Sequence, residues 1–191
     1  MARTAQTELA ILGALSVEPM TGYGLRAAIT DTLGHFWHES FGQIYPTLTA
    51  LEAAGLVRRE GKAGSGPLHL TPAGEARLRA LLAEPFSPPR ARDPLLLRLF
   101  FGRHVAPELT RERLIHALDA AVSRSEQFAR VRTEIEQDRD SADAIYWLLT
   151  VSAGEHAARA RIAWASEALE LLDHRAAEAG VREPERDSHG H

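Results

Sequence analysis

The segment from residue 21 to residue 60 restricts the possible folds more than any other part of the chain. Its first part, TGYGLRAAITDTLG, predicts a short amphipathic helix that ends at Gly34. Apolar residues recur there at i, i+3, i+4 and i+8, the one-sided pattern of a helix that packs on a core. These residues are Leu25, Ala28, Ile29 and Leu33. A second helix and the strand-like sequence GLVRRE follow, which is the order of elements in a winged helix-turn-helix.

The second helix is expected to begin at Ser40. Ser40 precedes Gln43 by three residues, a capping-box pair in which each side chain can hydrogen-bond a free backbone amide. Ile44, Leu48 and Leu51 have the spacing of a buried stripe. The other side of the helix, here called its outer face, then consists of Gln43, Tyr45, Pro46, Thr49 and Ala53.

The outer face has the chemistry needed in the major groove of DNA. Glutamine can hydrogen-bond bidentately to adenine, and threonine can contact phosphates or a thymine methyl group. Pro46 removes one backbone hydrogen bond and crowds the carbonyl group of Gly42, where the missing side chain leaves room for a bend. An ordinary solvated surface is the alternative interpretation of this face.

Three stretches carry a resemblance to a known family: GYGLRAAI, SFGQIYPTLTALEAAGLV and LTPAGEARL. They resemble the amino-terminal domain of PadR-type transcriptional regulators. The later stretches RDPLLLRLFFG and AIYWLLTVSAGEHAARARIAWASEALELL resemble the second half of the same family. The resemblance implies a dimeric regulator, usually a repressor, that binds operator DNA through its winged domain and answers a small molecule through its helical domain.

We therefore expect a set of DNA contacts from two helices and the wing. They are Thr21, Tyr23, Ser40, Gln43, Tyr45, Pro46, Thr49, Arg58 and Lys62. The wing, GKAGSGPLHLT, is poorer in cations than is usual in the family and has Leu68 where a tyrosine is typical. Residues 1–83 hold seven Lys or Arg and seven Asp or Glu, so a basic footprint is absent from the domain as a whole.

DNA affinity would then depend on locally placed cations. The candidates are Arg3, Arg26, Arg58, Arg59 and Lys62. The neutral domain also allows a second function class, a winged-helix protein-interaction module with weak or no DNA affinity. Salt-dependent DNA binding would separate the two, because phosphate contacts release counterions.

The predicted fold class is mainly α, with two or three short strands confined to the wing. An opening helix, roughly Thr4 to Ser16, packs on the core through Leu9, Leu12 and Leu15. A helix that begins near Pro72 closes the domain, and its expected packing residues are Leu78, Leu81 and Leu82.

The chain is expected to divide into two domains and a tail. Residues 1–83 form the winged helix-turn-helix domain, and the proline-rich residues 84–93 form a linker. Residues 94–175 form a helical dimerisation domain, which is also the place for an effector, and residues 176–191 form a flexible tail.

The last long helix has apolar residues at alternating spacings of three and four, the repeat of helices that pack side by side. We expect this seam to pair two subunits through Leu148, Val151, Ala158, Ile162, Ala165, Leu169 and Leu172. Glu155 interrupts the seam. Its expected partner is Arg159, four residues on, and a buried role in fixing the register is the alternative.

Several function classes lack support in the sequence. The chain has no cysteine, which excludes disulfides and thiolate chemistry, and it shows neither a metal-binding motif nor a catalytic frame, so we expect no cofactor, metal or enzymatic activity. It has no apolar run of membrane-spanning length and no signal peptide, so we expect a cytoplasmic protein. Trp37, Trp147 and Trp164 could line a pocket for a small aromatic or apolar effector, although core or interface packing is the more ordinary role.

Overall fold

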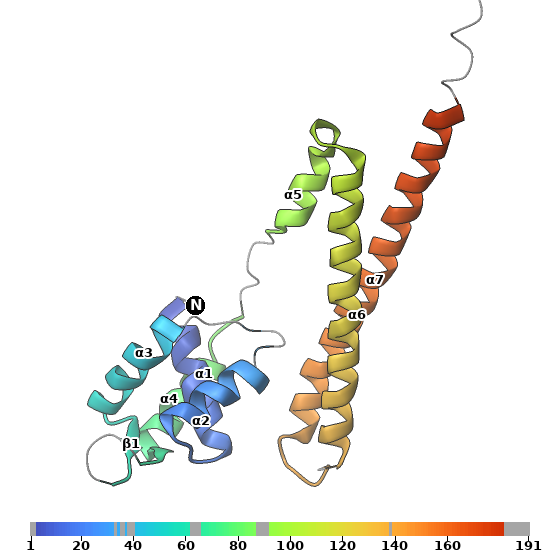
Figure 1. Cartoon of the computed structure of the whole chain (residues 1–191). Coiled ribbons are helices and arrows are strands. Elements are labelled where there is room, and N and C mark those ends of the chain that lie inside the picture. Colours follow the sequence, from blue (N-terminus) through green and yellow to red (C-terminus); the bar gives the residue numbers. More distant parts are fainter. Residues whose placement is uncertain are drawn as a thin grey trace, which may run out of the picture. The chain divides into compact units, whose positions relative to one another are not determined.

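The chain divides into two compact units, residues 1–90 and 91–191, and the division falls within the predicted linker. We call them the winged unit and the helical unit and describe each separately. A computed structural model describes the following residues: 3–32, 34, 37, 41–61, 66–86, 92–137 and 139–181. Both units consist mainly of helices, and the described residues contain one two-stranded antiparallel sheet, which confirms the predicted fold class (Figure 1).

The described residues of the winged unit contain four α-helices and the two strands. In chain order they are α1 (Arg3–Val17), α2 (Gly22–Ala27), α3 (Phe41–Ala53), β1 (Val57–Arg59), β2 (Leu68–Leu70) and α4 (Pro72–Leu82). The helix predicted up to Gly34 changes at Ala28, because residues 28–32 continue α2 as a π-helical turn. A π-helical turn within a helix is rare and often occurs near functional sites.

One apolar core holds the winged unit together. Its fully or nearly fully buried side chains come from every helix and from both strands: Ile11, Leu12, Leu15, Leu25, Ile29, Ile44, Leu48, Leu51, Val57, Leu68 and Leu81. The stripes predicted in α1, α2 and α3 are therefore confirmed for the described residues, whereas Leu33 lies outside them. The prediction for Leu82 was wrong, because this side chain is 66% exposed and α4 uses Leu78 and Leu81 instead.

The wing hairpin is attached to this core. Val57 pairs with Leu70, and Arg59 pairs with Leu68. Leu68, the position where the family typically has tyrosine, is fully buried and also pairs with Met20 through an isolated bridge. The leucine therefore acts as a core residue of the wing, and among the described residues the strands are restricted to this region, as predicted.

The helical unit consists of a short helix and a long helical hairpin. Its helices are α5 (Pro94–Phe100), α6 (Pro107–Gln137) and α7 (Ala144–Val181), with a single 3-10 turn, Gly102–His104, between α5 and α6. Figure 1 shows α6 and α7 side by side along most of α6. The predicted start of the tail at residue 176 was wrong, because the alanine-rich sequence continues α7 to Val181.

Part of the predicted dimerisation seam is buried within a single chain. Val151, Ala158 and Ala165 are at most 5% exposed in the helical unit. These three side chains are therefore unavailable to a second subunit, which corrects their expected role. The remaining seam residues are only partly buried, and their part in dimerisation stays a prediction: Leu148, Ile162, Leu169 and Leu172.

Glu155 has a different partner from the one expected. Its carboxylate accepts two hydrogen bonds from Arg132 of α6, each 2.8 Å long, so it ties the two long helices together. The predicted pairing with Arg159 as its principal partner was wrong. Close to this ion pair, Gly154 gives room to the ring of Phe128, since a Cβ at residue 154 would collide with that ring.

Candidate nucleic-acid interface

The outer face of α3 is exposed as the sequence predicts. Ile44, Leu48 and Leu51 are 1–4% exposed and hold the helix against the core. This packing turns the opposite side of α3 toward solvent, and all its predicted residues are exposed: Gln43, Tyr45, Pro46, Thr49 and Ala53. The helix continues through Pro46. A firmly packed helix thus presents an uncharged, hydrogen-bonding surface of modest size.

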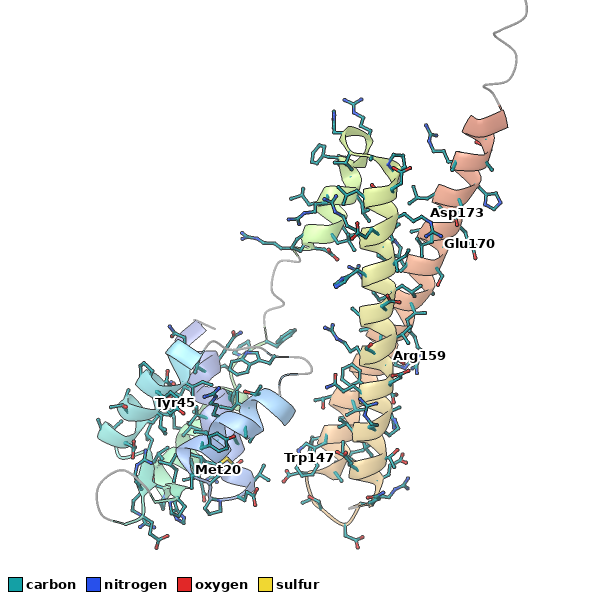
Figure 2. All side chains as sticks on the ribbon, in the orientation of Figure 1. Met20, Tyr45, Trp147, Arg159, Glu170 and Asp173 are labelled. Carbon is teal, nitrogen blue, oxygen red and sulfur yellow. The ribbon has the colours of Figure 1, made fainter. Side chains whose placement is uncertain are left out.

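Two side chains on the outer face are constrained by their surroundings. The hydroxyl of Thr49 donates a hydrogen bond to the carbonyl oxygen of Tyr45, 3.0 Å away. Thr49 can therefore offer an acceptor and a methyl group to a ligand, but its hydroxyl proton is engaged. The ring of Tyr45 lies at the start of α2, 3.9 Å from where a Cβ on Gly22 would stand. Figure 2 shows Tyr45 on the winged unit, among side chains of α2 and α3.

The start of α2 adds two of the predicted residues. Thr21 is the N-cap of α2, and its hydroxyl oxygen accepts a hydrogen bond from the backbone amide of Gly24 at 3.1 Å. Tyr23, in the first turn, is 77% exposed. An exposed tyrosine of this extent has little part in packing, so its phenol is available to a partner.

The two arginines of β1 have different environments. Arg58 is exposed and makes no ion pair with any residue in the described part of the chain. Arg59, next to it, is bound to Glu52 of α3 through two hydrogen bonds of 2.9 and 3.1 Å. The sequence grouped both as candidate phosphate contacts, but only Arg58 has an uncommitted charge. No sequence rule pointed to the Glu52–Arg59 ion pair, because its members lie on different elements.

Further along the wing, His69 of β2 and Glu60 approach each other. His69 Nε2 lies 2.9 Å from a carboxylate oxygen of Glu60, but the two atoms do not form a hydrogen bond. This places a second carboxylate close to the wing strands. Arg58 is therefore the uncommitted cation that the described part of the wing contributes.

The structure does not describe every predicted DNA contact and every candidate cation. Ser40, with the predicted capping box, and Lys62 lie outside the described residues. The same holds for the side chain of Arg3, although its backbone belongs to α1. Arg26 is half-buried and engaged in an interaction of its own.

The helical unit offers a different cluster of polar groups. Asp93 caps α5 by accepting hydrogen bonds from the amides of Leu95 and Leu96, and it also pairs with Arg161 of α7 at 3.0 Å. The amide of Leu96, with Arg161 contributing less, holds the pKa of the Asp93 carboxyl below its usual range. Arg161 lies 4.5 Å from the ring centroid of Trp164. These contacts attach the start of the unit to α7.

The predicted aromatic residues do not gather in one place within a unit. Trp37 packs against the core of the winged unit, whereas Trp147 and Trp164 both belong to α7, seventeen residues apart in sequence. In the described part of the chain, no three His, Asp or Glu side chains are grouped as a metal site would require. No helix among the same residues is long and apolar enough to cross a membrane.

The fold and the exposed outer face of α3 define a winged helix-turn-helix protein with a helical carboxy-terminal unit. Two family models match accordingly. Residues 11–80 match the transcriptional regulator PadR-like family, and residues 91–173 match the virulence activator alpha C-terminal domain. Residues 11–80 thus carry a PadR-like family domain, which confirms the resemblance seen in the sequence.

Curated relatives match only part of the chain. One is a probable transcriptional regulator, Rv1176c, of Mycobacterium tuberculosis, 33% identical over 86 residues that cover 42% of this chain and 46% of that protein. Another is an uncharacterised 37.1 kDa protein of transposon TN4556 from Streptomyces fradiae, 40% identical over 77 residues. The latter match covers 40% of this chain and 22% of that protein. The chain thus matches less than half the length of either relative.

Solved structures share the fold over most of the chain. The PadR-like regulator BC1756 of Bacillus cereus has a TM-score of 0.75 at 21% identity, covering 88% of this chain and 99% of that one. Bacillus subtilis PadR in complex with operator DNA has a TM-score of 0.72 at 20% identity, covering 86% and 96%. The same Bacillus protein in complex with p-coumaric acid gives 0.71 at 21% identity, covering 87% and 98%.

Proposed function

We propose that this protein is a dimeric transcriptional repressor of the cytoplasm that binds operator DNA through α3, the start of α2 and the wing. The observation that carries the proposal is the exposed outer face of α3, which presents Gln43, Tyr45 and Thr49 from a helix held firmly on the core. Such a face fits the major groove, where amide and hydroxyl groups can read base edges. The operator complex of the Bacillus PadR supports this reading.

Within this proposal, base reading and phosphate contact belong to different residues. Gln43 and Thr49 face the bases, while Arg58 and Lys62 contact phosphates from the wing. Replacing Gln43 by Ala should weaken operator binding by about 1–3 kcal/mol, and Arg58→Ala should reduce the salt slope by about one. Fluorescence anisotropy with DNA from the gene's upstream region, measured at several salt concentrations, tests both expectations. Arg79→Ala, which changes an exposed arginine of α4, is the control.

The proposed operator is an inverted repeat, because a two-fold dimer presents two copies of α3. Half-site centres should lie about 10 base pairs apart, or a multiple of that, if both helices approach one face of the duplex. Inserting half a helical turn should then remove most of the specific affinity. Binding that does not depend on salt, or no binding at all, would favour the alternative of a protein-interaction module.

We place the dimer contacts on the apolar surface that the helical unit leaves exposed. It comprises two separate groups of large side chains, one on α5 and one at the beginning of α7: Leu96, Leu97 and Phe100, and Ile145, Tyr146 and Leu149. A helical surface of this composition is typical of a protein interface. Partly buried seam residues such as Ile162 and Leu169 can extend it.

A small aromatic or apolar effector is the last part of the proposal. The complex of the Bacillus PadR with p-coumaric acid supports it. Titration with p-coumaric acid should quench tryptophan fluorescence and release operator DNA if this chain takes a related ligand. DNA binding that is unaffected by the compound would show that its effector, if it has one, belongs to another chemical class.

A further inference from the structure

The Glu52–Arg59 ion pair connects the two parts of the winged unit that would face DNA. Arg59 Nε lies 2.9 Å from one carboxylate oxygen of Glu52, and Nη2 lies 3.1 Å from the other. Both side chains are about three-quarters buried, with 22% and 28% of their surfaces exposed. A bidentate contact between two planar groups fixes their orientation as well as their distance.

Each end of the ion pair is joined to a residue of the candidate interface. Glu52 lies in the last turn of α3, three residues after Thr49 and seven after Tyr45, so the three share one side of the helix. Arg59 follows Arg58 on β1, and neighbouring residues of a strand point to opposite faces. The ion pair thus links the helix proposed to read bases to the strand that presents a cation.

A short turn joins these two elements, and the ion pair spans it. α3 ends at Ala53, and Gly55 turns the chain with a φ of 70°, a conformation that glycine adopts readily. The amide of Leu56 donates a hydrogen bond of 3.0 Å to the carbonyl oxygen of Leu51, which fixes the turn locally. Beyond the turn, the Glu52–Arg59 contact holds β1 to α3, in addition to the burial of Val57 and the hydrogen bonds from Thr71 to the Leu56 carbonyl.

Charge gives the pair a second effect. Unpaired, the Glu52 carboxylate would place a negative charge on the same side of α3 as Thr49 and would repel DNA phosphates. When the Glu52 carboxylate is paired with Arg59, the adjacent guanidinium compensates its negative charge. The same pairing withdraws Arg59 from phosphate contact and leaves that task to Arg58.

We propose that Glu52 and Arg59 are positioning residues that set the angle between α3 and the wing, and through it the discrimination between operator and other DNA. The inference rests on the proposed function, because it requires that α3 and the wing contact the same DNA. Arg59 itself contacts no phosphate. Its removal should therefore affect specificity, whereas removal of Arg58 should affect the salt dependence of binding.

The test uses the full chain and a double variant that leaves net charge unchanged, Glu52→Gln with Arg59→Gln. Affinities for operator and for unrelated DNA are measured across a salt series by fluorescence anisotropy. The ratio of the two affinities should fall about tenfold, the size of one lost base contact, while the salt slope stays that of the original protein. Arg58→Gln should do the opposite, lowering the slope by about one and leaving the ratio nearly unchanged.

Two further variants separate positioning from loss of fold. The exchange Glu52→Arg with Arg59→Glu rebuilds the ion pair and should restore most of the discrimination. Arg59→Lys keeps the charge but loses the bidentate geometry, so it should lower the ratio even if the double glutamine variant does not fold. The matched control is Glu75→Gln with Arg79→Gln, which removes an exposed ion pair of α4 and should change neither quantity.

Either of two results would overturn the inference. One is unchanged discrimination in folded Arg59→Lys or in the folded double glutamine variant. The other is a salt slope that falls by about one in Arg59→Gln, as in Arg58→Gln, since Arg59 would then contact phosphate. If the original protein shows no salt-dependent operator binding, the proposed function itself fails, an outcome that is visible before any variant is made.

Discussion

The winged unit and the helical unit bury their apolar residues to different degrees. Among the described residues, most large apolar side chains that are at most 4% exposed belong to the winged unit, and Leu114 and Phe128 of α6 are the exceptions. The helical unit instead exposes a series of large apolar side chains along α5, α6 and α7, among them Leu97, Phe100 and Leu149. One unit encloses its core, and the other leaves much of its apolar surface to solvent.

The difference follows from how many elements each unit can place around a core. In the winged unit, four helices and a hairpin surround one set of side chains, so each stripe has a partner on several sides. Two long helices can bury only the strip where they touch, and a wide apolar surface stays outside it. A unit of this kind gains stability when another helical surface covers the remainder, which a second subunit would do.

The strongest test of this comparison is Leu149→Asp in α7. Leu149 is 62% exposed in the single chain, so the change should barely affect the monomer. At a subunit interface it would bury an unpaired charge at a cost of about 3–5 kcal/mol and yield monomers. Light scattering after size exclusion measures the outcome. Leu82→Asp, in the winged unit, has nearly the same exposure, 66%, and should leave the dimer intact.

A dimer that survives Leu149→Asp at low micromolar concentration would place the interface elsewhere on the molecule. Phe100→Asp in α5 then examines the other group of exposed side chains. If both variants remained dimeric, the exposed surface of the helical unit would need a different partner. The contrast between the two units would then say nothing about self-association.

A matching test of the winged unit is Leu12→Ala in α1, which changes a buried side chain instead of an exposed one. Leu12 is fully buried, and its truncation leaves a cavity that should lower the stability of the winged unit by about 3 kcal/mol. Urea unfolding followed by circular dichroism measures the loss, and light scattering should still find a dimer. A variant that unfolds and dissociates in one transition would show that the two units are more strongly coupled than their separate cores suggest.

The sequence predicted the outer face of α3 because the periodicity of one helix is a local property. Ile44, Leu48 and Leu51 repeat at helical spacing, and the core of the winged unit accepts that stripe. The order of helices and strands could be read for the same reason. The predicted DNA contacts rest on this face, and their role stays a prediction.

Partners on different elements could not be predicted in this way. Glu155 was assigned to Arg159 because the i, i+4 rule covers only pairs within a helix, whereas Arg132 lies across the hairpin. The ion pair between Glu52 and Arg59 could not be predicted for the same reason. The apolar seam of α7 predicted burial correctly at Val151, Ala158 and Ala165, but periodicity says nothing about which helix covers a stripe.

Gly154→Ala tests the packing inside the helical hairpin and should have a smaller effect. A methyl group there meets the ring of Phe128, and overpacking of this kind costs about 1–3 kcal/mol. Adding Phe128→Leu should recover part of the loss. Gly13→Ala in α1 is the control, since its Cβ would meet nothing within 4 Å and alanine favours helix by about 1 kcal/mol. Equal effects of the two glycine changes would contradict the described packing.

Glu155→Gln should have the smallest effect on stability, and the size of this effect depends on pH. The hydrogen bond from Arg132 holds the pKa of the Glu155 carboxyl below its ordinary value of 4.5. A carboxylate whose pKa is lowered by folding stabilises the folded state above its unfolded pKa, and the contribution is lost as pH falls through the folded pKa. The original protein should therefore be the more stable at neutral pH, by a modest amount because solvent screens a partly exposed pair.

The gap in unfolding free energy between the original protein and Glu155→Gln should narrow below about pH 4.5, where protonation removes the same charge as the substitution. Urea unfolding at pH 7, 5 and 4 measures it, with Glu75→Gln in the winged unit as the exposed control. A gap that stays constant over this range would show that Arg132 does not stabilise the charged form of Glu155.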